Sequence, residues 1–451
     1  MKKFNYFKLY FEKRMLRILL LGVISGFPWV LIGSALTLWL KESEISRSTI
    51  GWAGLIFSVY AINFLWAPLI DRLQIPFLSK KIGHRKSWIV LMQFIIFTCL
   101  ISWSFLNTVD NLWFIIAIGL GIAISSSTQD ITLDALRIEQ IGKNESSSMA
   151  AGAAISVVGW WTGYKIGGIV SLVSAELLQK QGIENYWQIS FLLLTTIIVL
   201  CNIGLLFIPE ADSSARKKLI LSADKKMLKK IGVSNIFTKI LAWISGTLIN
   251  PLTSFFKKNG FNVAIGILSF IFLFKIGEAF LGRMSILFYK EIGFSKTDIA
   301  LYSKGIGWIT TITFTLLGGL FAIRMGLLKA LFLSGIIMAL TNLMFSALAW
   351  MDKSEILFAF VVLLDDLAAA FATVAFVGFI SVLVDRTYTA TQYALLASIG
   401  TAGRTLFASS SGTLVDWLNG DWGIFFIITA IMVIPSLLCL FIIKDKLKLN
   451  E

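Results

Sequence analysis

The sequence predicts an all-α integral membrane protein with twelve transmembrane helices in two halves of six. Three observations support this prediction. Hydrophobic residues make up 57% of the 451-residue chain and charged residues only 15%, whereas a soluble protein needs about 25% charge to cover its surface. Apolar runs long enough to cross a bilayer recur along the whole chain. A short sequence in the first half also returns at the matching place in the second half.

Runs of about 20 apolar residues define the expected spans. They lie at 16–40, 48–70, 87–106, 111–136, 147–178, 188–208, 262–289, 296–322, 327–350, 354–384, 389–411 and 422–444. Basic residues precede the first run, and no small-residue cleavage site with a polar mature start follows it. We therefore expect this run to be a first spanning helix and not a cleaved signal.

The net charge of +14 does not form one basic patch, because the basic residues fall in the short connections between apolar runs. This is the pattern of membrane topology and not of a nucleic-acid-binding face. The basic residues gather mostly on one side of the predicted topology, so both termini should be cytoplasmic by the positive-inside rule.

Several classes of function are disfavoured by what the sequence lacks. The three cysteines lie singly inside apolar runs and only one histidine is present, so we expect no disulfide framework, metal site or haem attachment. The chain has no phosphate-binding P-loop, no GxSxG and no HExxH sequence. ATP-driven transport and common hydrolytic mechanisms therefore have no basis here, and we expect no enzyme activity and no cofactor.

The twelve spans divide into residues 1–208 and 261–451, joined by a cytoplasmic linker over 209–260. The first part of the linker is rich in Lys, Ser and Asp and should be solvated. The second part is apolar but interrupted by polar residues and proline, which favours an amphipathic helix on the inner membrane face. A thirteenth span is the alternative, but it would reverse the charge bias of the second half.

An internal repeat supports the two halves. The sequence KESEISRSTIG at Lys41–Gly51 matches KEIGFSKTDIA at Lys290–Ala300, and each connects the first and second spans of its half. Two six-helix halves related by a parallel repeat are the architecture of the major facilitator superfamily, in which substrate binds near the membrane midplane between the halves.

Span 4 carries two carboxylates in the run SSSTQDITLDALRIE. Asp130 and Asp134 are four residues apart and Arg137 follows three later, so all three share one helix face. An acid inside a membrane span is costly and commonly faces a protein interior or a water-filled path. We expect both aspartates to carry protons, although Asp134 and Arg137 could simply pair at the cytoplasmic rim.

Between spans 2 and 3 the chain has an ordered set of charges that resembles the cytoplasmic signature of major facilitator transporters. The resemblance rests on Asp71, Arg72, Gly83, Arg85 and Lys86. In that superfamily such residues form charge contacts that hold the inner gate closed, and we expect Arg137 to act there too. The alternative is an ordinary polar loop whose charges serve only topology.

Other polar and aromatic residues within spans are candidates for substrate binding. Cations would hold substrate carboxylates, amides would meet sugar hydroxyls and indole rings would stack on sugars; the candidates are Gln129, Trp160, Trp161, Lys165, Lys275, Lys304, Asp365, Asp366, Gln392 and Arg404. Lys275 lies three residues before Glu278 and can pair with it. Burial favours the neutral form of a carboxyl group, so Glu278 is a third candidate proton carrier. Internal ion pairs and simple packing are the alternatives.

The chain also resembles the AmpG-type muropeptide permeases, over nearly its whole length. The likeness is carried by GVISGFPWVLIGSALTLWL, FLWAPLIDRLQIPFL, SSSTQDITLDAL, AAGAAISVVG, FKIGEAF and TYTATQYALLASIGTAGR. The resemblance implies import of N-acetylglucosamine–anhydro-N-acetylmuramyl peptides driven by the proton gradient, with Asp130 and Asp134 as its required aspartates. The chain departs from the family pattern at Trp160–Trp161, Glu278 and Asp365–Asp366, all near the expected cavity.

These observations together predict a proton-coupled importer of muropeptides, in the inner membrane of a Gram-negative bacterium, that serves cell-wall recycling. Its partners would be an anionic amino-sugar peptide, protons and the lipid bilayer, with no nucleic acid, and we expect a monomer. One alternative is a transporter of the same fold for another bulky anionic metabolite, such as acetyl-coenzyme A, a siderophore or a peptide. Another is a non-transporting sensor or scaffold.

Overall fold

The structure is a computed structural model that describes residues 7–45, 53–142, 144–210, 222, 249–294, 307–408 and 410–447. Every regular element in these ranges is helical. The linker residues 211–221 and 223–248, most of the expected amphipathic helix among them, lie outside the described residues, as do Lys304 and parts of spans 2 and 8 and of both copies of the repeat. Residues 249–259 of the linker form a helix, which we call the linker helix.

A first group of helices covers the six spans expected in the N-terminal half. Its elements are α1 (Phe7–Tyr10), α2 (Lys13–Val30), η1 (Leu31–Ala35), α3 (Leu36–Glu42), η2 (Gly54–Ser58), α5 (Val59–Ile62), η3 (Asn63–Leu65), α6 (Ala67–Arg72), α7 (Leu78–Ile82), α8 (His84–Trp103), α9 (Thr108–Glu139), α10 (Ser146–Lys180) and α11 (Tyr186–Leu206). The elements α2, η1 and α3 run without a break, so span 1 is one continuous helical segment.

A second group covers the spans expected in the C-terminal half. Its elements are α14 (Phe261–Leu273), α15 (Ile276–Glu291), α17 (Gly307–Met325), α18 (Leu327–Trp350), α19 (Glu355–Leu383), η5 (Arg386–Tyr388), α20 (Thr389–Ala408), α21 (Ser411–Trp417), α22 (Trp422–Ile431), α23 (Ile434–Ile443) and η6 (Lys444–Lys446). A helical segment therefore occurs at each of the twelve expected spans.

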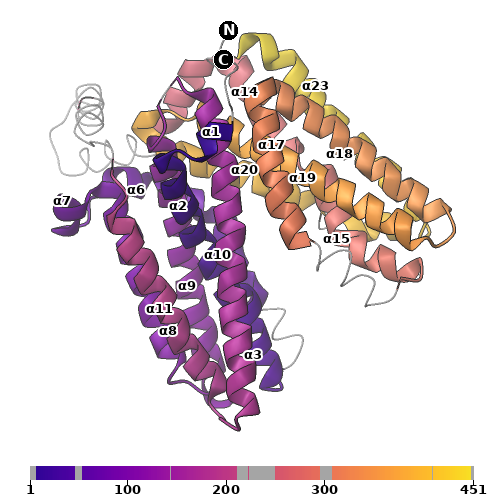
Figure 1. The fold of residues 1–451 in the computed structure, drawn as a ribbon. Helices are drawn as coiled ribbons and strands as arrows, with labels where there is room; N and C mark the ends of the chain where they lie inside the picture. The colour runs from indigo at the N-terminus through magenta and orange to yellow at the C-terminus, as the bar shows by residue number, and fades with distance from the viewer. Residues whose placement is uncertain are drawn as a thin grey trace.

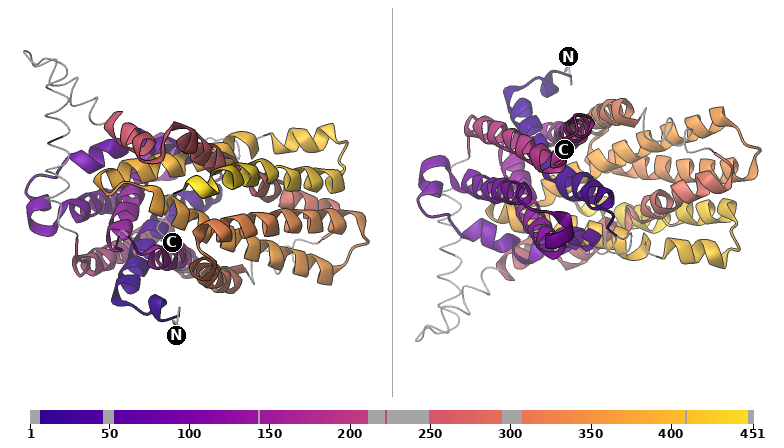
Figure 2. Two further views of the ribbon diagram at one scale, coloured as in Figure 1. Left: turned by 90° about the horizontal axis from the view of Figure 1, so that it is seen from above. Right: turned by 90° about the horizontal axis from the view of Figure 1, so that it is seen from below.

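The two groups meet at the end of the molecule where both chain termini lie and diverge toward the other end (Figure 1). Seen along the perpendicular direction, the indigo-to-magenta helices and the orange-to-yellow helices again occupy opposite sides of the molecule (Figure 2). We call the end that carries the termini the closed end and the opposite one the open end. The described part of the protein is all-helical, as the sequence predicts.

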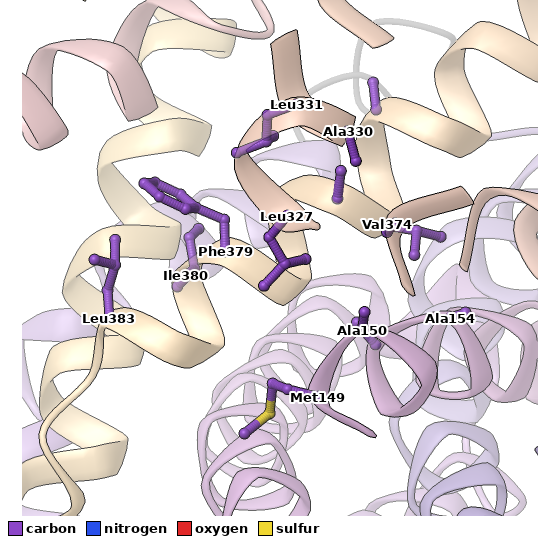
Figure 3. Packing of buried hydrophobic residues seen from close by; sticks show 14 of the residues in the cluster. Met149, Ala150, Ala154, Leu327, Ala330, Leu331, Val374, Phe379, Ile380 and Leu383 are labelled. Carbon is purple, nitrogen blue, oxygen red and sulfur yellow. The ribbon is translucent and has the colours of Figure 1, made fainter. Parts of the chain in front are cut away.

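The hydrophobic cores follow this shape. One large buried cluster is shared by both groups, and in it Met149, Ala150 and Ala154 of α10 pack with Leu327 of α18 and Val374 of α19 (Figure 3). Toward the open end each group has a separate cluster, around Trp103 and Phe191 in the first group and around Phe288 and Phe426 in the second. The apolar packing that joins the groups therefore lies at the closed end.

Eight helical segments in the described part of the chain are long and apolar enough to cross a membrane, and Leu55–Leu65 and Ile309–Met325 are shorter apolar helices. The two remaining expected spans coincide with α10 and α20, whose sequences are rich in Gly, Ala, Ser and Thr. Both helices pack against the opposite group, α10 against α17 and α19 and α20 against α6 and α9. They face protein over much of their length, so they need less apolar surface than the others.

Paired glycines bring α2 and α10 into backbone contact. Gly22 and Gly26 on α2 lie opposite Gly159 and Gly163 on α10, and a Cβ at Gly26 would lie only 1.9 Å from the carbonyl oxygen of Trp160. Small residues four apart on each of two membrane helices permit such a close approach. This contact fixes the side chains that project from α2 and α10 relative to each other.

The first span of each half is irregular near its middle. Pro28 interrupts α2 and is followed by the π-helical turn η1, because proline removes a backbone donor and bends a helix. In the second half the turn at Phe274–Lys275 separates α14 from α15. The irregularity in the second half places Lys275 and Glu278 beside a break in the helix.

The N-terminal segment reaches across the closed end to the other group. Tyr10 of α1 donates a hydrogen bond of 2.8 Å to the backbone oxygen of Leu316 on α17. Its hydroxyl fills the space above Gly319, where a Cβ would lie 2.1 Å from it. Tyr10 thus ties the beginning of the chain to the second group.

Candidate functional site

The side chain of Asp130 on α9 is held by two neutral donors from α2. Ser25 Oγ donates to Asp130 Oδ1 at 2.7 Å, and Trp29 Nε1 donates to Asp130 Oδ2 at 3.4 Å. Ser25 and Trp29 lie one helical turn apart, which lets both reach the same carboxyl group. The sequence analysis identified Asp130 but neither of its partners.

Aromatic rings form a wall beside Asp130. The Trp29 ring centroid lies 4.4 Å from that of Tyr60 on α5 and 5.7 Å from that of Trp160 on α10. Trp160 is stacked on Tyr164 with ring centroids 5.5 Å apart, and Trp161 meets Trp160 edge-on at 5.1 Å. All five residues are half-buried, so each ring keeps part of its surface open. We call this set the aromatic wall.

Asp134, one helical turn after Asp130 on α9, belongs to a contact between the two groups. Asp134 Oδ1 accepts hydrogen bonds from Arg137 Nε at 3.1 Å and Nη2 at 2.9 Å. Arg137 Nη2 also donates to Ser381 Oγ on α19 at 3.0 Å, and its guanidinium lies 5.6 Å from the ring centroid of Tyr393 on α20. Arg137 is 1% exposed, so its charge depends on these partners.

The predicted gate residues form a buried network at the closed end. Arg85 Nη2, on a fully buried side chain, donates to Asp71 Oδ1 at 2.6 Å and to Glu139 Oε1 at 3.1 Å. Asp71 Oδ2 in turn accepts from the backbone N–H of Thr391 at 2.8 Å and from its hydroxyl at 2.6 Å. Asp71 therefore caps the first turn of α20, where a helix N-terminus favours negative charge.

A second contact at the closed end has its donor on the second group and its acceptors on the first. Arg386, in the connection between α19 and α20, donates to the backbone oxygens of Ile138 and Ile141 at the C-terminal end of α9, the latter at 2.8 Å. Cations stabilise the C-terminal carbonyls of a helix. Asp71 of the first group thus caps the N-terminus of α20 in the second group, and Arg386 of the second group caps the C-terminus of α9 in the first.

The linker helix holds the same connection. Ser254 Oγ donates to Asp385 Oδ2 at 2.7 Å, and Lys258 Nζ donates to the backbone oxygen of Leu383 at 3.0 Å. Burial raises the pKa of the Asp385 carboxyl, but hydrogen bonds from Ser254 and Thr387 together with the charge of Lys258 hold that pKa below its ordinary value. Asp385 is consequently stabilised as a carboxylate.

A separate ionic cluster lies in the second group. Lys275 Nζ donates to Glu278 Oε2 at 2.5 Å and to Thr373 Oγ1 at 2.9 Å, so the pair suggested by the sequence spacing is present. Asp365 on α19 accepts a hydrogen bond of 3.3 Å from Thr341 Oγ1. Asp366 next to it is half-buried.

Comparison with known proteins places the chain in a family. Residues 18–303 match the family model described as Major Facilitator Superfamily. A protein designated AmpG 4, of Rickettsia conorii, is 34% identical over 97% of this chain and 98% of its own length. The anhydromuropeptide permease of Escherichia coli K12 is 28% identical over 98% of this chain and 82% of its own length.

This chain belongs to the AmpG-type muropeptide permease family, within the major facilitator superfamily.

Solved structures agree on the fold. A major facilitator proton:xylose symporter, XylE, superposes with a TM-score of 0.62 at 16% identity, over 97% of both chains. The human organic anion transporter MFSD10 superposes with a TM-score of 0.57 at 15% identity, over 95% of this chain and 99% of its own. At these identities the likeness concerns architecture alone. The predicted fold is confirmed, and the chain is a multi-pass membrane transporter.

Two side chains of this AmpG-type protein that were predicted to bind sugar hydroxyls, Gln129 and Gln392, lie away from any open surface. Gln129 is fully buried and donates from Nε2 to the backbone oxygen of Ile24 at 2.9 Å. Gln392 is 2% exposed at the closed end, where it donates to the backbone oxygen of Pro251 and accepts from the N–H of Asp385. In this conformation both amides serve the fold.

The other predicted residues are placed as follows. Lys165 on α10 is half-buried, and Arg404 on α20 is exposed on the same face of its helix as Tyr393 and Gly400. Lys86 contributes its backbone N–H to Glu210 Oε2 at 3.0 Å, and Gly83 adopts a φ of 101°, which favours glycine. Arg72 is half-buried beside Asp71.

Several residues of the closed end escaped the sequence analysis. Glu139, Thr391, Ser381 and Arg386 all take part in contacts with the predicted gate residues or with their helices. Thr391 lies inside the run TATQYALL that carries the family resemblance, which is the one signal that could have identified it. The rest pair with residues far away in the sequence, so no local pattern marks them.

Proposed function

We propose that this protein is a proton-coupled importer of anhydromuropeptides in the inner membrane of a Gram-negative bacterium, with both termini in the cytoplasm. Membership of the AmpG-type family supports the transported class, and the Escherichia coli relative is an anhydromuropeptide permease. The basic residues near the termini support the orientation. We propose residues 1–208 and 261–451 as the two moving halves, joined by the linker.

The observation that carries the proton coupling is the environment of Asp130. A carboxylate within a membrane span is costly, and here Asp130 accepts hydrogen bonds from the hydroxyl of Ser25 and the indole of Trp29. Neutral donors can hydrogen-bond to a carboxylate, and no cation loses its partner when that carboxylate takes up a proton. We therefore assign Asp130 the uptake and release of a proton.

Asp134 would connect the proton to the gate. It shares Arg137 with Ser381 of the other half, so protonation of Asp134 would leave Arg137 without its anionic partner. A charge contact present in one state biases the protein toward that state by its differential free energy. Protonation at Asp134 would thereby weaken a contact that holds the closed end together.

Opening of the closed end would also require the two helix caps to separate. Asp71 would leave the first turn of α20, and Arg386 would leave the last turn of α9. Arg85 and Glu139 stay with Asp71 in the first half, so the Asp71 carboxylate keeps a partner when it loses Thr391. The Asp71 carboxylate therefore stays paired when the gate opens.

The substrate would lie between the halves on the open side. The aromatic wall offers ring faces for the sugars, and aromatic stacking of this kind adds to apolar burial. Lys165 and Arg404 offer positive charge for peptide carboxylates from opposite halves. The Lys275–Glu278 pair, with Asp365 and Asp366, would supply a further proton-responsive cluster in the second half.

The test is uptake of labelled anhydromuropeptide by proteoliposomes, with and without an imposed inward proton gradient. We expect accumulation above equilibrium with the gradient and only equilibration without it. Gradient-independent uptake would refute proton coupling, and no uptake at all would refute the substrate. Acetyl-coenzyme A in the same assay checks the alternative of another bulky anion.

A further inference from the structure

A groove at the closed end is lined by residues of the second group alone. It has a volume of about 380 Å³ and runs between the beginning of α18 and the end of α23. The lining residues are Met325, Leu328, Lys329, Phe332, Leu333, Leu440, Phe441 and Lys444. Six of them are apolar and two are lysines, and no acid is among them.

The two kinds of residue are separated along the groove. Lys329 lies near the beginning of α18 and Lys444 directly follows the end of α23, so both mark the same end. Phe332 and Leu333 follow Lys329 by one helical turn, and Leu440 and Phe441 precede Lys444 by one turn. At about 1.5 Å per residue, the apolar residues lie roughly 5–6 Å deeper in the membrane than the lysines.

The lysines are not tied to acids by the contacts described at the groove. Both are exposed, and Lys444 Nζ lies 3.9 Å above the ring centroid of Phe441. A cation over an aromatic face keeps its charge available to an anion on its other side. Asp445 follows Lys444 in the chain but does not line the groove.

We propose that this groove binds an anionic phospholipid from the leaflet next to the chain termini. The headgroup phosphate would lie between Lys329 and Lys444, and an acyl chain would lie against Phe332, Leu440 and Phe441. Basic pockets between membrane helices on the cytoplasmic side suit anionic lipids, whereas a zwitterionic headgroup brings its own cation toward the lysines. The positive charge of the two lining lysines therefore favours an anionic phospholipid over a zwitterionic one.

The position of the groove also defines what the lipid does. All eight lining residues belong to the second group, so separation of the two halves removes none of them from the groove. A ligand shifts a conformational equilibrium only through differential affinity for the two states. The bound lipid therefore stabilises the second half against unfolding and leaves the balance between transport states unchanged.

Native mass spectrometry of the detergent-purified full chain tests the proposal, with phosphatidylglycerol and phosphatidylethanolamine of identical acyl chains. We expect tighter binding of phosphatidylglycerol. Each lysine near an anionic headgroup contributes roughly fivefold in affinity, so K329Q/K444Q should lose about 25-fold. K329R/K444R should retain the affinity, and K446Q is the matched control because Lys446 is exposed nearby but outside the lining.

Equal binding of the two lipids, or undiminished phosphatidylglycerol binding by K329Q/K444Q, would overturn the proposal. If the double variant elutes as an aggregate, K329Q and K444Q are measured singly, each with an expected loss of about fivefold. The thermal midpoint gives a second measurement. Added phosphatidylglycerol should raise it for wild type and K446Q but not for K329Q/K444Q, and an equal rise in all three contradicts the site.

Discussion

The Gln129 side chain on α9 donates a hydrogen bond to a backbone carbonyl of α2 that has no helical donor because of Pro28. Pro28 has no N–H for the oxygen of Ile24 four residues earlier, and Gln129 Nε2 donates to that oxygen at 2.9 Å. Gln129 Oε1 and Gln93 Oε1 have no hydrogen-bond partner among the described residues, and both residues line a small cavity of about 10 Å³. The bond joins spans 1 and 4 one residue away from Asp130.

This relationship predicts a structural role for Gln129 that a double-mutant cycle can measure. Gln129→Met should lower stability by about 1–3 kcal/mol, because a buried carbonyl loses its donor. In a Pro28→Ala background the helix supplies its own N–H, so the same substitution should cost clearly less. Thermal unfolding of the four proteins in one detergent gives the coupling. Equal losses in both backgrounds would show that Gln129 does not act through the Ile24 carbonyl.

Asp130→Asn should abolish gradient-driven uptake while the protein still inserts, because the amide keeps the shape of the side chain but cannot exchange a proton. Uptake is compared in proteoliposomes at equal protein content. Ser25→Ala is the companion variant, since it removes the 2.7 Å bond and leaves the carboxyl group in place. We expect Ser25→Ala to retain coupled uptake with a shifted pH dependence. Undiminished accumulation by Asp130→Asn would remove Asp130 from the coupling path.

Thr391→Val should favour opening of the closed end, because it removes the hydroxyl that donates to Asp71 at 2.6 Å. A hydrogen bond to a charged group contributes about 1.5–3 kcal/mol, so the ratio of open to closed molecules should rise by at least tenfold. Spin labels at two exposed lysines report the distance between the halves: Lys80 on α7 of the first group, and Lys257 on the linker helix, which is hydrogen-bonded to the second group.

Thr389→Val is the control for that measurement, because in the described part of the chain the Thr389 hydroxyl donates to the backbone oxygen of Arg386, three residues earlier, and not to the first group. The ratio should stay unchanged in Thr389→Val. The same shift in both threonine variants would mean that packing at the start of α20, and not the Asp71 contact, sets the ratio.

Tyr10→Phe should loosen the N-terminal segment from α17. The variant loses the bond to Leu316 and keeps the ring, so we expect about 1 kcal/mol of weaker closure. Gly319→Ala should have a larger effect, since its Cβ would displace the Tyr10 hydroxyl. Limited proteolysis near residue 10 checks both variants. Unchanged cleavage rates in both would show that the segment is held by its other contacts.

The Asp385 contact predicts a dependence of stability on pH. Its pKa is lowered in the folded protein, so the stabilisation is fully present above the ordinary aspartate pKa of about 3.8 and is lost as the pH falls through the folded value. The difference in thermal midpoint between wild type and Asp385→Asn should therefore be constant from pH 5 to 7 and shrink in stronger acid. A difference that grows on acidification would contradict the assignment.

Patterns in the sequence predicted the features that depend on residues close together in the chain. Apolar run length located the helices, and three-residue spacing anticipated the pairs Lys275–Glu278 and Asp134–Arg137. The contact of Asp71 with Thr391 joins residues on different halves, so only folding brings them together. Gln129 illustrates a second limit of prediction from sequence. An amide in a membrane span suggests contact with a ligand, and only the position of Pro28 on a neighbouring helix indicates the structural partner of Gln129.

The low apolarity of α10 and α20 has a consequence for how the chain is made. Helices enter the bilayer from the ribosome-bound insertion channel when their side chains favour lipid over water, and α10 and α20 fall short of that by composition. For α10 the glycine surface of α2 is already in place when it is synthesised. Two of the helices that α20 packs against, α6 and α9, were synthesised more than 200 residues earlier, and two others, α14 and α15, precede it in its own half. The surface of the first half that α20 covers therefore stays open until α20 is made, and we expect a chain that stops before α20 to present that surface to quality-control proteases.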